Sequence, residues 1–125
     1  MIYNPKEFKL ERTTIWSFKE RGKWATHKGD YRGNCPPQVP RNLILKYTEE
    51  KDIVLDPFCG SGTSMIECKL LNRKGIGIDI NIDALKLARS RLNFKYQTIY
   101  EPRLLRADST NLQKIIPNEK IDFIF

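Results

Sequence analysis

The residues with the clearest chemical potential lie in Asp56–Ser64, "DPFCGSGTS", between the short apolar run "IVL" and the segment "MIECKLL". An acidic residue, two glycines and several small hydroxylated residues thus stand where a strand would turn into a helix. Glycine lets the backbone approach a ligand with no Cβ atom in the way. Open α/β sheets bind ligands at the carboxyl ends of their strands, so this turn is a candidate ligand-binding loop.

Three classes of ligand could occupy such a turn. A nucleoside triphosphate needs a lysine after the second glycine of its phosphate loop, but Thr63 follows Gly62 here. A dinucleotide needs a third glycine where Met65 stands, and the Asp56 carboxylate would repel its phosphates. S-adenosylmethionine has no phosphate and carries an ammonium and a sulfonium, which a carboxylate attracts. The turn therefore favours S-adenosylmethionine, and a glycine turn without any ligand is the alternative.

Two further acidic residues end apolar runs downstream. Asp79 closes "KGIGID", roughly twenty residues beyond the glycines, where a carboxylate can accept hydrogen bonds from ribose hydroxyls. Ile80 beside it can pack on an adenine face, and Asp108, which ends "RLLRAD", can accept a hydrogen bond from the adenine amino group. Each aspartate could instead cap a helix or form a turn. Three acids at the ends of three successive strands favour the ligand-binding interpretation.

Strands and helices alternate from Asp52 onward, and they must bring these acids together. Asn81 is the expected N-cap of a helix that turns Lys86, Arg89 and Lys95 to water. The alternation predicts an α/β fold with a Rossmann-like, doubly wound, mostly parallel sheet. We expect strands at residues 52–56, 74–79, 103–108 and 120–125, helices at 41–48, 63–72 and 81–96, and a short helix or turn at 109–116.

Residues 1–33 have no clear periodicity and are expected to form an irregular basic arm before a second unit at residues 34–125. Residues 1–48 contain ten Lys and Arg against four Asp and Glu, whereas residues 49–125 contain twelve against eleven. This excess favours an anionic partner such as nucleic acid, with a basic solvated surface as the alternative. Trp16 and Trp24 could contact DNA, cover a cofactor or form a small hydrophobic cluster. His27 is expected on the surface or at a DNA backbone.

The composition predicts a cytoplasmic protein without a metal site. No run of about 18 apolar residues could span a membrane, and the N-terminus lacks the apolar core of a signal peptide. Three cysteines without a CxxC pair fit a reducing compartment, and with a single histidine they give no metal-ligand spacing. Cys59 is expected to be a small packing residue rather than a nucleophile.

Four segments resemble the motifs of the S-adenosylmethionine-dependent amino DNA methyltransferases. "DPFCGSGTS" is similar to their motif I, "GIGIDI" to motif II, "RADSTNL" to motif III and "GNCPPQVPRNLI" to motif X. Motif X before motif I is the permuted order of the group called β. The stretch "TTIWSFKERGKWATHKGDYRGN" also resembles the N-terminal arm of the DNA methylase N-4/N-6 group. The resemblance spans nearly the whole chain and implies a class I methyltransferase fold, DNA as partner and a restriction–modification setting.

The resemblance also implies how S-adenosylmethionine would bind. Asp56 and the Gly60–Thr63 backbone would hold its methionine part, Asp79 its ribose, and Ile80 with Asp108 its adenine, while the motif X segment would close over the methionine end. No catalytic residue and no metal ligand is implied. The implied cofactor-binding residues are Asn34, Pro36, Pro40, Arg41, Asp56, Phe58, Gly60, Ser61, Gly62, Thr63, Asp79, Ile80 and Asp108.

The chemistry implied by the family is methyl transfer to an exocyclic amine, N6 of adenine or N4 of cytosine. Its motif IV, Asp/Asn/Ser-Pro-Pro-Tyr/Phe/Trp, accepts the amine hydrogens and stacks on the flipped base. That motif should follow the fourth strand, and Pro36-Pro37 is the only Pro-Pro pair here. We therefore expect an incomplete fold of about four strands, inactive alone and completed by a downstream half, with "IDFIF" as an exposed apolar edge strand. The alternatives are a fragment of an RNA guanine-N2 methyltransferase and a non-catalytic remnant or assembly subunit.

Overall fold

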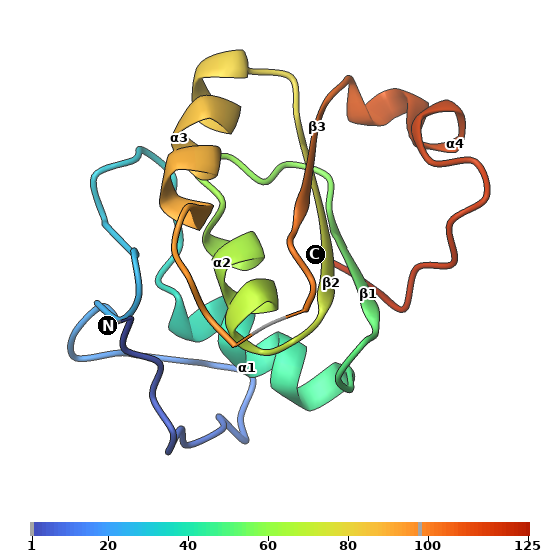
Figure 1. Ribbon diagram of the computed structural model, residues 1–125. Helices are drawn as coiled ribbons and strands as arrows, with labels where there is room; N and C mark the ends of the chain where they lie inside the picture. The colour runs from blue at the N-terminus through green and yellow to red at the C-terminus, as the bar shows by residue number, and fades with distance from the viewer. Residues whose placement is uncertain (1, 98) are drawn as a thin grey trace.

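The computed structural model describes residues 2–97 and 99–125 and contains one sheet with helices on both of its faces (Figure 1). Strands alternate with helices after the first helix, so the predicted α/β, Rossmann-like fold is confirmed. The elements in chain order are α1 (Gln38–Tyr47), β1 (Ile53–Asp56), α2 (Thr63–Leu70), β2 (Lys74–Asp79), α3 (Ile82–Leu92), β3 (Arg103–Arg106), η1 (Ser109–Asn111), α4 (Leu112–Ile115) and β4 (Phe123–Ile124).

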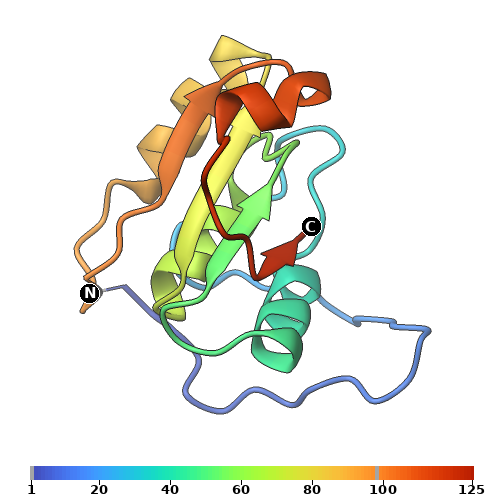
Figure 2. The same cartoon turned by 90° about the vertical axis from the view of Figure 1, so that its right-hand side faces the viewer.

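The described strands form a parallel sheet in the order β3-β2-β1-β4. Helices α1, α2 and α3 cover one face, whereas the connection from β3 to β4 places α4 on the other (Figures 1 and 2). In the pairing register Asp56 lies beside Gly77, and Asp79 lies beside Arg106. The sheet is therefore doubly wound, and its carboxyl ends meet at one edge, which is where the sequence places the candidate ligand site.

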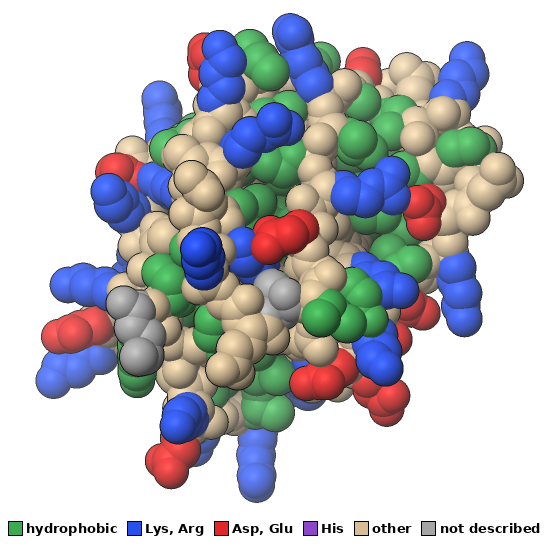
Figure 3. Space-filling model, viewed as in Figure 1, with side chains coloured by type: hydrophobic (Ala, Val, Ile, Leu, Met, Phe, Trp, Pro, Cys, Tyr) green, Lys and Arg blue, Asp and Glu red, His purple; other side chains and the backbone are tan. Residues whose placement is uncertain are grey.

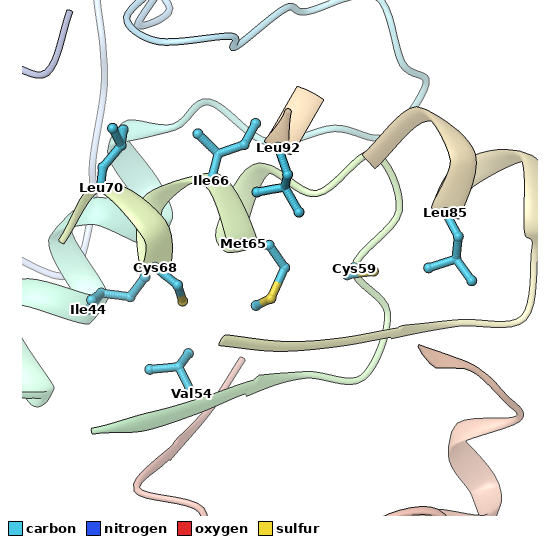
Figure 4. Packing of buried hydrophobic residues seen from close by; sticks show 9 residues of the cluster. All are labelled: Ile44, Val54, Cys59, Met65, Ile66, Cys68, Leu70, Leu85 and Leu92. Atoms are coloured by element: carbon cyan, nitrogen blue, oxygen red, sulfur yellow. The ribbon is translucent and has the colours of Figure 1, made fainter. Parts of the chain in front are cut away.

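Two apolar clusters hold the sheet between its helices. Neighbouring strand residues point to opposite faces, so Val54 enters one cluster and Leu55 the other. The smaller cluster, on the α4 face, is built on Leu55, Ile76 and Ile78. The larger cluster lies beneath α1, α2 and α3 (Figure 4) and contains Ile44, Val54, Cys59, Met65, Ile66, Cys68, Leu70, Leu85 and Leu92.

Met65 stands where a dinucleotide fold would carry its third glycine, and its side chain is fully buried. Strand β2 provides the space that this side chain needs. A Cβ atom at Gly75 would lie 2.9 Å from Met65 Sδ, and one at Gly77 would lie 3.0 Å from Met65 Cγ. The close approach of helix α2 to the sheet therefore depends on glycines in the strand instead of a glycine in the helix.

Helix α3 begins as predicted but ends earlier. Asn81 Oδ1 accepts a hydrogen bond from Asp83 N at 2.9 Å, so the predicted N-cap is confirmed. The helix ends at Leu92, and the prediction that it continues to residue 96 is wrong. The buried ammonium of Lys69 donates to the carbonyls of Leu92 at 2.9 Å and Phe94 at 2.7 Å. These bonds satisfy carbonyl groups at the end of the helix and turn the chain away.

The described part of the arm, residues 2–33, contains no helix or strand and is docked on the rest of the chain. Trp24 packs against the larger apolar cluster, and its ring lies edge-on to Phe8 and His27. This outcome confirms the cluster interpretation for Trp24. His27 is only 8% exposed, with Nε2 at 2.7 Å from Glu67 Oε1, so the prediction of a surface histidine is wrong. The reason is a carboxylate on α2 that lies forty residues away in sequence.

Strand β4 forms one edge of the sheet and carries apolar side chains. Ile124 is 55% exposed, and the Tyr47 ring stacks on Phe123 with 6.1 Å between ring centroids. The predicted exposed apolar edge is thus present among the described residues.

Lys and Arg side chains spread over the face that carries α3 and β3 (Figure 3), so basic charge is not confined to the arm. No helix in the described part of the chain has the length and apolar character needed to cross a membrane.

Candidate cofactor-binding site

The turn between β1 and α2 is built on two glycines with left-handed backbone conformation. Gly60 has φ +52° and Gly62 has φ +86°, a region that costs a residue with a Cβ atom about 1–2 kcal/mol. Space is also restricted: a Cβ atom at Gly62 would lie 2.9 Å from Ala88 Cβ on α3, and one at Gly60 would lie 3.1 Å from Tyr31 Cε1. Conformation and contact both favour glycine here, and Tyr31 of the arm covers the turn.

Hydrogen bonds join the carboxyl ends of β1, β2 and β3. The Gly60 N–H donates to Asp79 Oδ2 at 2.9 Å, and the Ala107 N–H donates to the Asp79 carbonyl at 3.2 Å. The Ser109 hydroxyl donates to the Pro57 carbonyl. The segments that resemble motifs I, II and III therefore meet in one place.

The segment that resembles motif X lies against the same turn. Thr63 Oγ1 donates to Asn34 Oδ1 at 2.6 Å, and Asn34 Nδ2 donates to the Lys28 carbonyl at 2.9 Å. Arg21 holds the backbone here by donating to the carbonyls of Asn34 at 3.2 Å and Cys35 at 2.7 Å. Residues of the arm thus fix this segment beside the glycine turn.

Asp56 is a partly buried carboxylate at the end of β1. Its Oδ1 accepts a hydrogen bond from the Phe58 N–H at 3.0 Å, and its Oδ2 accepts one from the Ser64 hydroxyl. Burial raises the pKa of Asp56 above its ordinary value; the two hydrogen bonds oppose this shift, and the charge of Asp79 adds to it. The ion pairs found among residues 2–97 and 99–125 include neither Asp56 nor Asp79. Two nearby carboxylates without a basic partner attract a cation.

Asp79 and Asp108 keep acceptor capacity after their internal bonds are counted. Asp79 accepts one N–H on each oxygen, from Gly60 and Asn81. An ionised carboxylate has about four acceptor positions, so about two remain for hydroxyl groups. Asp108 Oδ1 accepts the N–H and the hydroxyl of Thr110, at 2.9 and 2.8 Å, and these bonds lower the pKa of Asp108. The alternative role of Asp108 as a cap, here of η1, is therefore present, while its Oδ2 takes no part in those bonds.

Two large apolar side chains are exposed at this edge. Phe58 is 79% exposed just after β1, and Ile80 is 65% exposed just after β2. Covering apolar surface is favourable by about 25 cal/mol per Å², and the flat face of a base could cover such side chains. An unpaired carboxylate for a cation, free acceptors for ribose hydroxyls and exposed apolar side chains for a base together fit S-adenosylmethionine.

The other predicted site residues lie deeper in the structure. Ser61 is buried inside the turn, and Pro36 is partly buried, with its carbonyl accepting the Val39 N–H at 3.0 Å. Pro40 and Arg41 are buried in α1. The Arg41 guanidinium donates to Glu67 Oε2 at 2.7 Å and to Asn4 Oδ1 at 2.6 Å, so it links the arm to α2 rather than facing the open edge.

Cys59 is 6% exposed and packs against β2, where a Cβ atom at Gly77 would lie 3.0 Å from its Sγ. Burial, together with the charges of Asp56 and Asp79, raises the pKa of Cys59 to about 12. The thiolate needed for nucleophilic attack is therefore disfavoured, and the prediction of a packing residue is confirmed.

Sequence reasoning missed Tyr31 and Glu67. Tyr31 gives no local signal, because its contact with Gly60 joins two distant segments. Glu67 does give one: it is a charged residue inside the apolar helix segment "SMIECKLL", and such a residue needs partners when it is buried.

Comparison with known proteins agrees with the family resemblance found in the sequence. A family model described as DNA methylase matches residues 2–90. The chain is 38% identical over 84 residues to the type II methyltransferase M.HpaI of Haemophilus parainfluenzae, covering 67% of this chain and 27% of that protein. It is 44% identical over 75 residues to the type II methyltransferase M2.LlaDCHI of Lactococcus lactis subsp. cremoris, covering 60% and 27%. The chain thus spans just over a quarter of the length of these relatives.

Solved structures confirm the predicted fold. TrmN from Thermus thermophilus has a TM-score of 0.62 at 27% identity, covering 74% of this chain and 28% of that chain. An rRNA methylase from Streptococcus thermophilus has a TM-score of 0.57 at 22% identity, covering 74% and 55%. The second likeness concerns the fold alone, because its identity is low.

Proposed function

The chain belongs to the N6/N4 family of DNA methylases, and on this premise we propose that it forms the S-adenosylmethionine-binding part of a DNA methyltransferase. The enzyme would methylate an exocyclic amine in DNA, N6 of adenine or N4 of cytosine, within a restriction–modification system. S-adenosylmethionine is the cofactor of this family, and when bound it supplies a methyl group on a positively charged sulfur.

Each group at the carboxyl edge has a separate task in this proposal. Asp56 and the backbone of Gly60–Thr63 hold the cationic methionine end, with Asn34 and Pro36 beside it. Asp79 accepts hydrogen bonds from the ribose hydroxyls. The adenine lies against Phe58 and Ile80, and Asp108 accepts a hydrogen bond from its amino group. Pro40, Arg41 and Ser61 act from buried positions, by supporting the segments that form the site.

One observation carries the proposal: the carboxylates of Asp56 and Asp79 share the edge without a basic partner among the described residues. Asp79 Oδ2 accepts the Gly60 N–H at 2.9 Å, while the charge of Asp79 contributes to the raised pKa of Asp56. A phosphate would be repelled from this place and a sulfonium or ammonium would be attracted. The electrostatics therefore support S-adenosylmethionine over a nucleotide phosphate.

Recognition of the target base is a task of residues outside this site. The sequence contains no Pro-Pro-Tyr, Pro-Pro-Phe or Pro-Pro-Trp, so we infer that the chain alone does not transfer methyl groups and that a complementary half carries motif IV and target recognition. The net charge of +7 supports DNA as the polyanionic partner. Three free thiols support a reducing, cytoplasmic location.

Calorimetry with S-adenosylmethionine tests the cofactor role. Asp79→Ala is expected to weaken binding by about 1–3 kcal/mol, because charge-assisted hydrogen bonds are lost. Asp83→Ala is the matched control: Asp83 is an exposed acid in the first turn of α3, and its loss should leave affinity unchanged. Equal affinities of the unaltered chain and Asp79→Ala would remove the ribose role. A preference of the unaltered chain for a nucleoside triphosphate or a dinucleotide would refute the proposed cofactor.

Methyl transfer from labelled S-adenosylmethionine tests the rest of the proposal. The chain alone should not label DNA, whereas addition of the downstream half of a family member should restore labelling. Turnover on DNA by the chain alone would show that catalytic residues lie within it. Labelling of RNA in preference to DNA by the completed enzyme would favour the RNA methyltransferase alternative.

A further inference from the structure

A fully buried carboxylate, Glu67, joins α2 to the arm. Glu67 Oε1 accepts a hydrogen bond from Trp24 Nε1 at 2.5 Å and lies 2.7 Å from His27 Nε2, and Oε2 accepts one from Arg41 Nη1 at 2.7 Å. A buried charge without partners is strongly disfavoured, and these donors offset that cost. Glu67 itself makes none of the contacts described at the glycine turn, so any influence on the turn must pass through its partners.

Glu67 and Thr63 are four residues apart in α2 and therefore lie on the same face of the helix. The chain that leads from the arm into the segment resembling motif X is bound at both positions, by His27 of the arm at Glu67 and by Asn34 at Thr63. Side chains four residues apart on a helix are only about 6 Å from one another. Residues 28–33, here called the arm loop, must therefore leave the helix surface between the two anchors, and Tyr31 of this loop is the residue that reaches Gly60.

The arm loop is braced by further hydrogen bonds. The Asn34 N–H donates to the Tyr31 carbonyl at 3.1 Å, and Asn34 Nδ2 donates to the Lys28 carbonyl at 2.9 Å. Arg91 at the end of α3 donates to Asp30. The position of the Tyr31 ring on the turn is thus set by contacts at both ends of the loop, one of which is the contact between His27 and Glu67.

We propose that Glu67 is a positioning residue for S-adenosylmethionine, because through His27 and Trp24 it holds the arm loop, and with it Tyr31 and Asn34, against the glycine turn. The inference rests on the proposed function, since it concerns the affinity of that same site. When the anchor is lost, the loop is docked for only part of the time, and the apparent dissociation constant rises by the inverse of the docked fraction. The loss of affinity should come from contacts with the methionine end of the ligand, which lies at the turn, and not from contacts with the adenosine end.

Binding of two probes, S-adenosylmethionine and adenosine, tests the inference in the 125-residue chain. Glu67→Gln places an amide N–H₂ among three donors and should raise the dissociation constant for S-adenosylmethionine on the order of tenfold, while that for adenosine stays within about twofold. His27→Ala should act in the same direction and leaves Glu67 bound to Arg41 and Trp24, so it carries the test if Glu67→Gln does not fold. His27→Gln should restore affinity, because its amide can donate to Glu67 in place of the imidazole.

Arg73→Met separates positioning from general stability. Arg73 is buried before β2, where it donates to the Thr48 hydroxyl at 2.9 Å, to the Thr48 carbonyl at 2.7 Å and to the Leu71 carbonyl at 2.7 Å, and neither partner residue belongs to the arm loop. This variant should melt at a lower temperature but keep its affinity for S-adenosylmethionine. The positioning role is refuted if Glu67→Gln and His27→Ala have lower melting temperatures but bind S-adenosylmethionine like the unaltered chain. It is also refuted if both variants lose as much affinity for adenosine as for S-adenosylmethionine. If the unaltered chain binds neither probe, the proposed function itself fails.

Discussion

Gly62 offers a quantitative test of how the turn is built, through the substitution Gly62→Ala. Two costs add. A left-handed conformation costs a residue with a Cβ atom about 1–2 kcal/mol. The new Cβ atom would also lie 2.9 Å from Ala88 Cβ and 3.4 Å from Ala88 Cα, and such overpacking costs about 1–3 kcal/mol. The total, about 2–5 kcal/mol, is large beside the stability of about 5–15 kcal/mol typical of a domain.

Gly33→Ala is the matched control for Gly62→Ala. Gly33 has φ +79°, close to that of Gly62, but a Cβ atom there would meet nothing within 4 Å. Only the conformational cost should remain, about 1–2 kcal/mol. The difference between the two variants therefore measures the contact between the turn and α3.

Urea denaturation followed by tryptophan fluorescence gives both free energies of unfolding, and equal slopes would show that the unfolded states are comparable. A third variant, Ala88→Gly, removes the methyl group that Gly62→Ala would meet. The double variant should be more stable than the sum of the single effects predicts, by about 1–2 kcal/mol. The close approach of α2 and α3 at this turn is refuted if two results are found together. Gly62→Ala would lower the free energy of unfolding no more than Gly33→Ala does, and the effects in the double variant would be additive.

Asp56 and Asn81 allow two further tests. Burial raises the pKa of Asp56, so its ionised form disfavours the folded state at neutral pH, and this cost declines as the pH falls below the raised folded-state pKa and is gone below the unfolded-state pKa. Asp56→Asn should therefore raise the melting temperature of the ligand-free chain at neutral pH. In the unaltered chain, acidification should weaken the binding of S-adenosylmethionine, and Asp56→Asn should abolish this effect. An affinity of the unaltered chain that does not change with pH would contradict this role. Asn81→Ala should lower the free energy of unfolding by about 1 kcal/mol in urea, because the cap of α3 is lost, whereas the exposed Asn118→Ala should have little effect.

The strands, and the edge of the sheet where Asp56 and Asp79 meet, could be predicted because their signals are local. Asp56 and Asp79 each end an apolar run, and glycines or asparagine follow at positions that need a turn or a cap. These signals fix the last residue of β1 and of β2, whereas β3 ends at Arg106 rather than at the predicted residue 108, and β4 is shorter than predicted at both ends. In β4, for example, only Phe123–Ile124 are strand residues, because the Asp122 side chain accepts the Ile53 N–H at 2.8 Å where a longer ladder would have continued.

The docking of the arm could not be predicted because its contacts join residues that are far apart in sequence. Trp24 and His27 meet Glu67 across 43 and 40 positions, and no periodicity relates a lone histidine to a carboxylate at that distance. The end of α3 has the same origin, because the ammonium that donates to its last carbonyl, that of Leu92, belongs to Lys69 in α2. Long-range polar contacts therefore account for the errors in the arm and at the end of α3.

The same burial that makes Asp56 unfavourable in the ligand-free chain makes it effective toward a cation. In water, a carboxylate and an ammonium attract each other weakly, whereas the attraction grows as solvent is excluded. Ser64 and the Phe58 N–H orient the Asp56 oxygens without neutralising them, and Asp79 adds a second negative charge nearby. A basic residue at this edge would stabilise the fold, but it would remove the field that distinguishes a sulfonium from a phosphate. Under the proposed function, binding rather than folding explains the unpaired carboxylates, and their replacement should therefore separate stability from affinity.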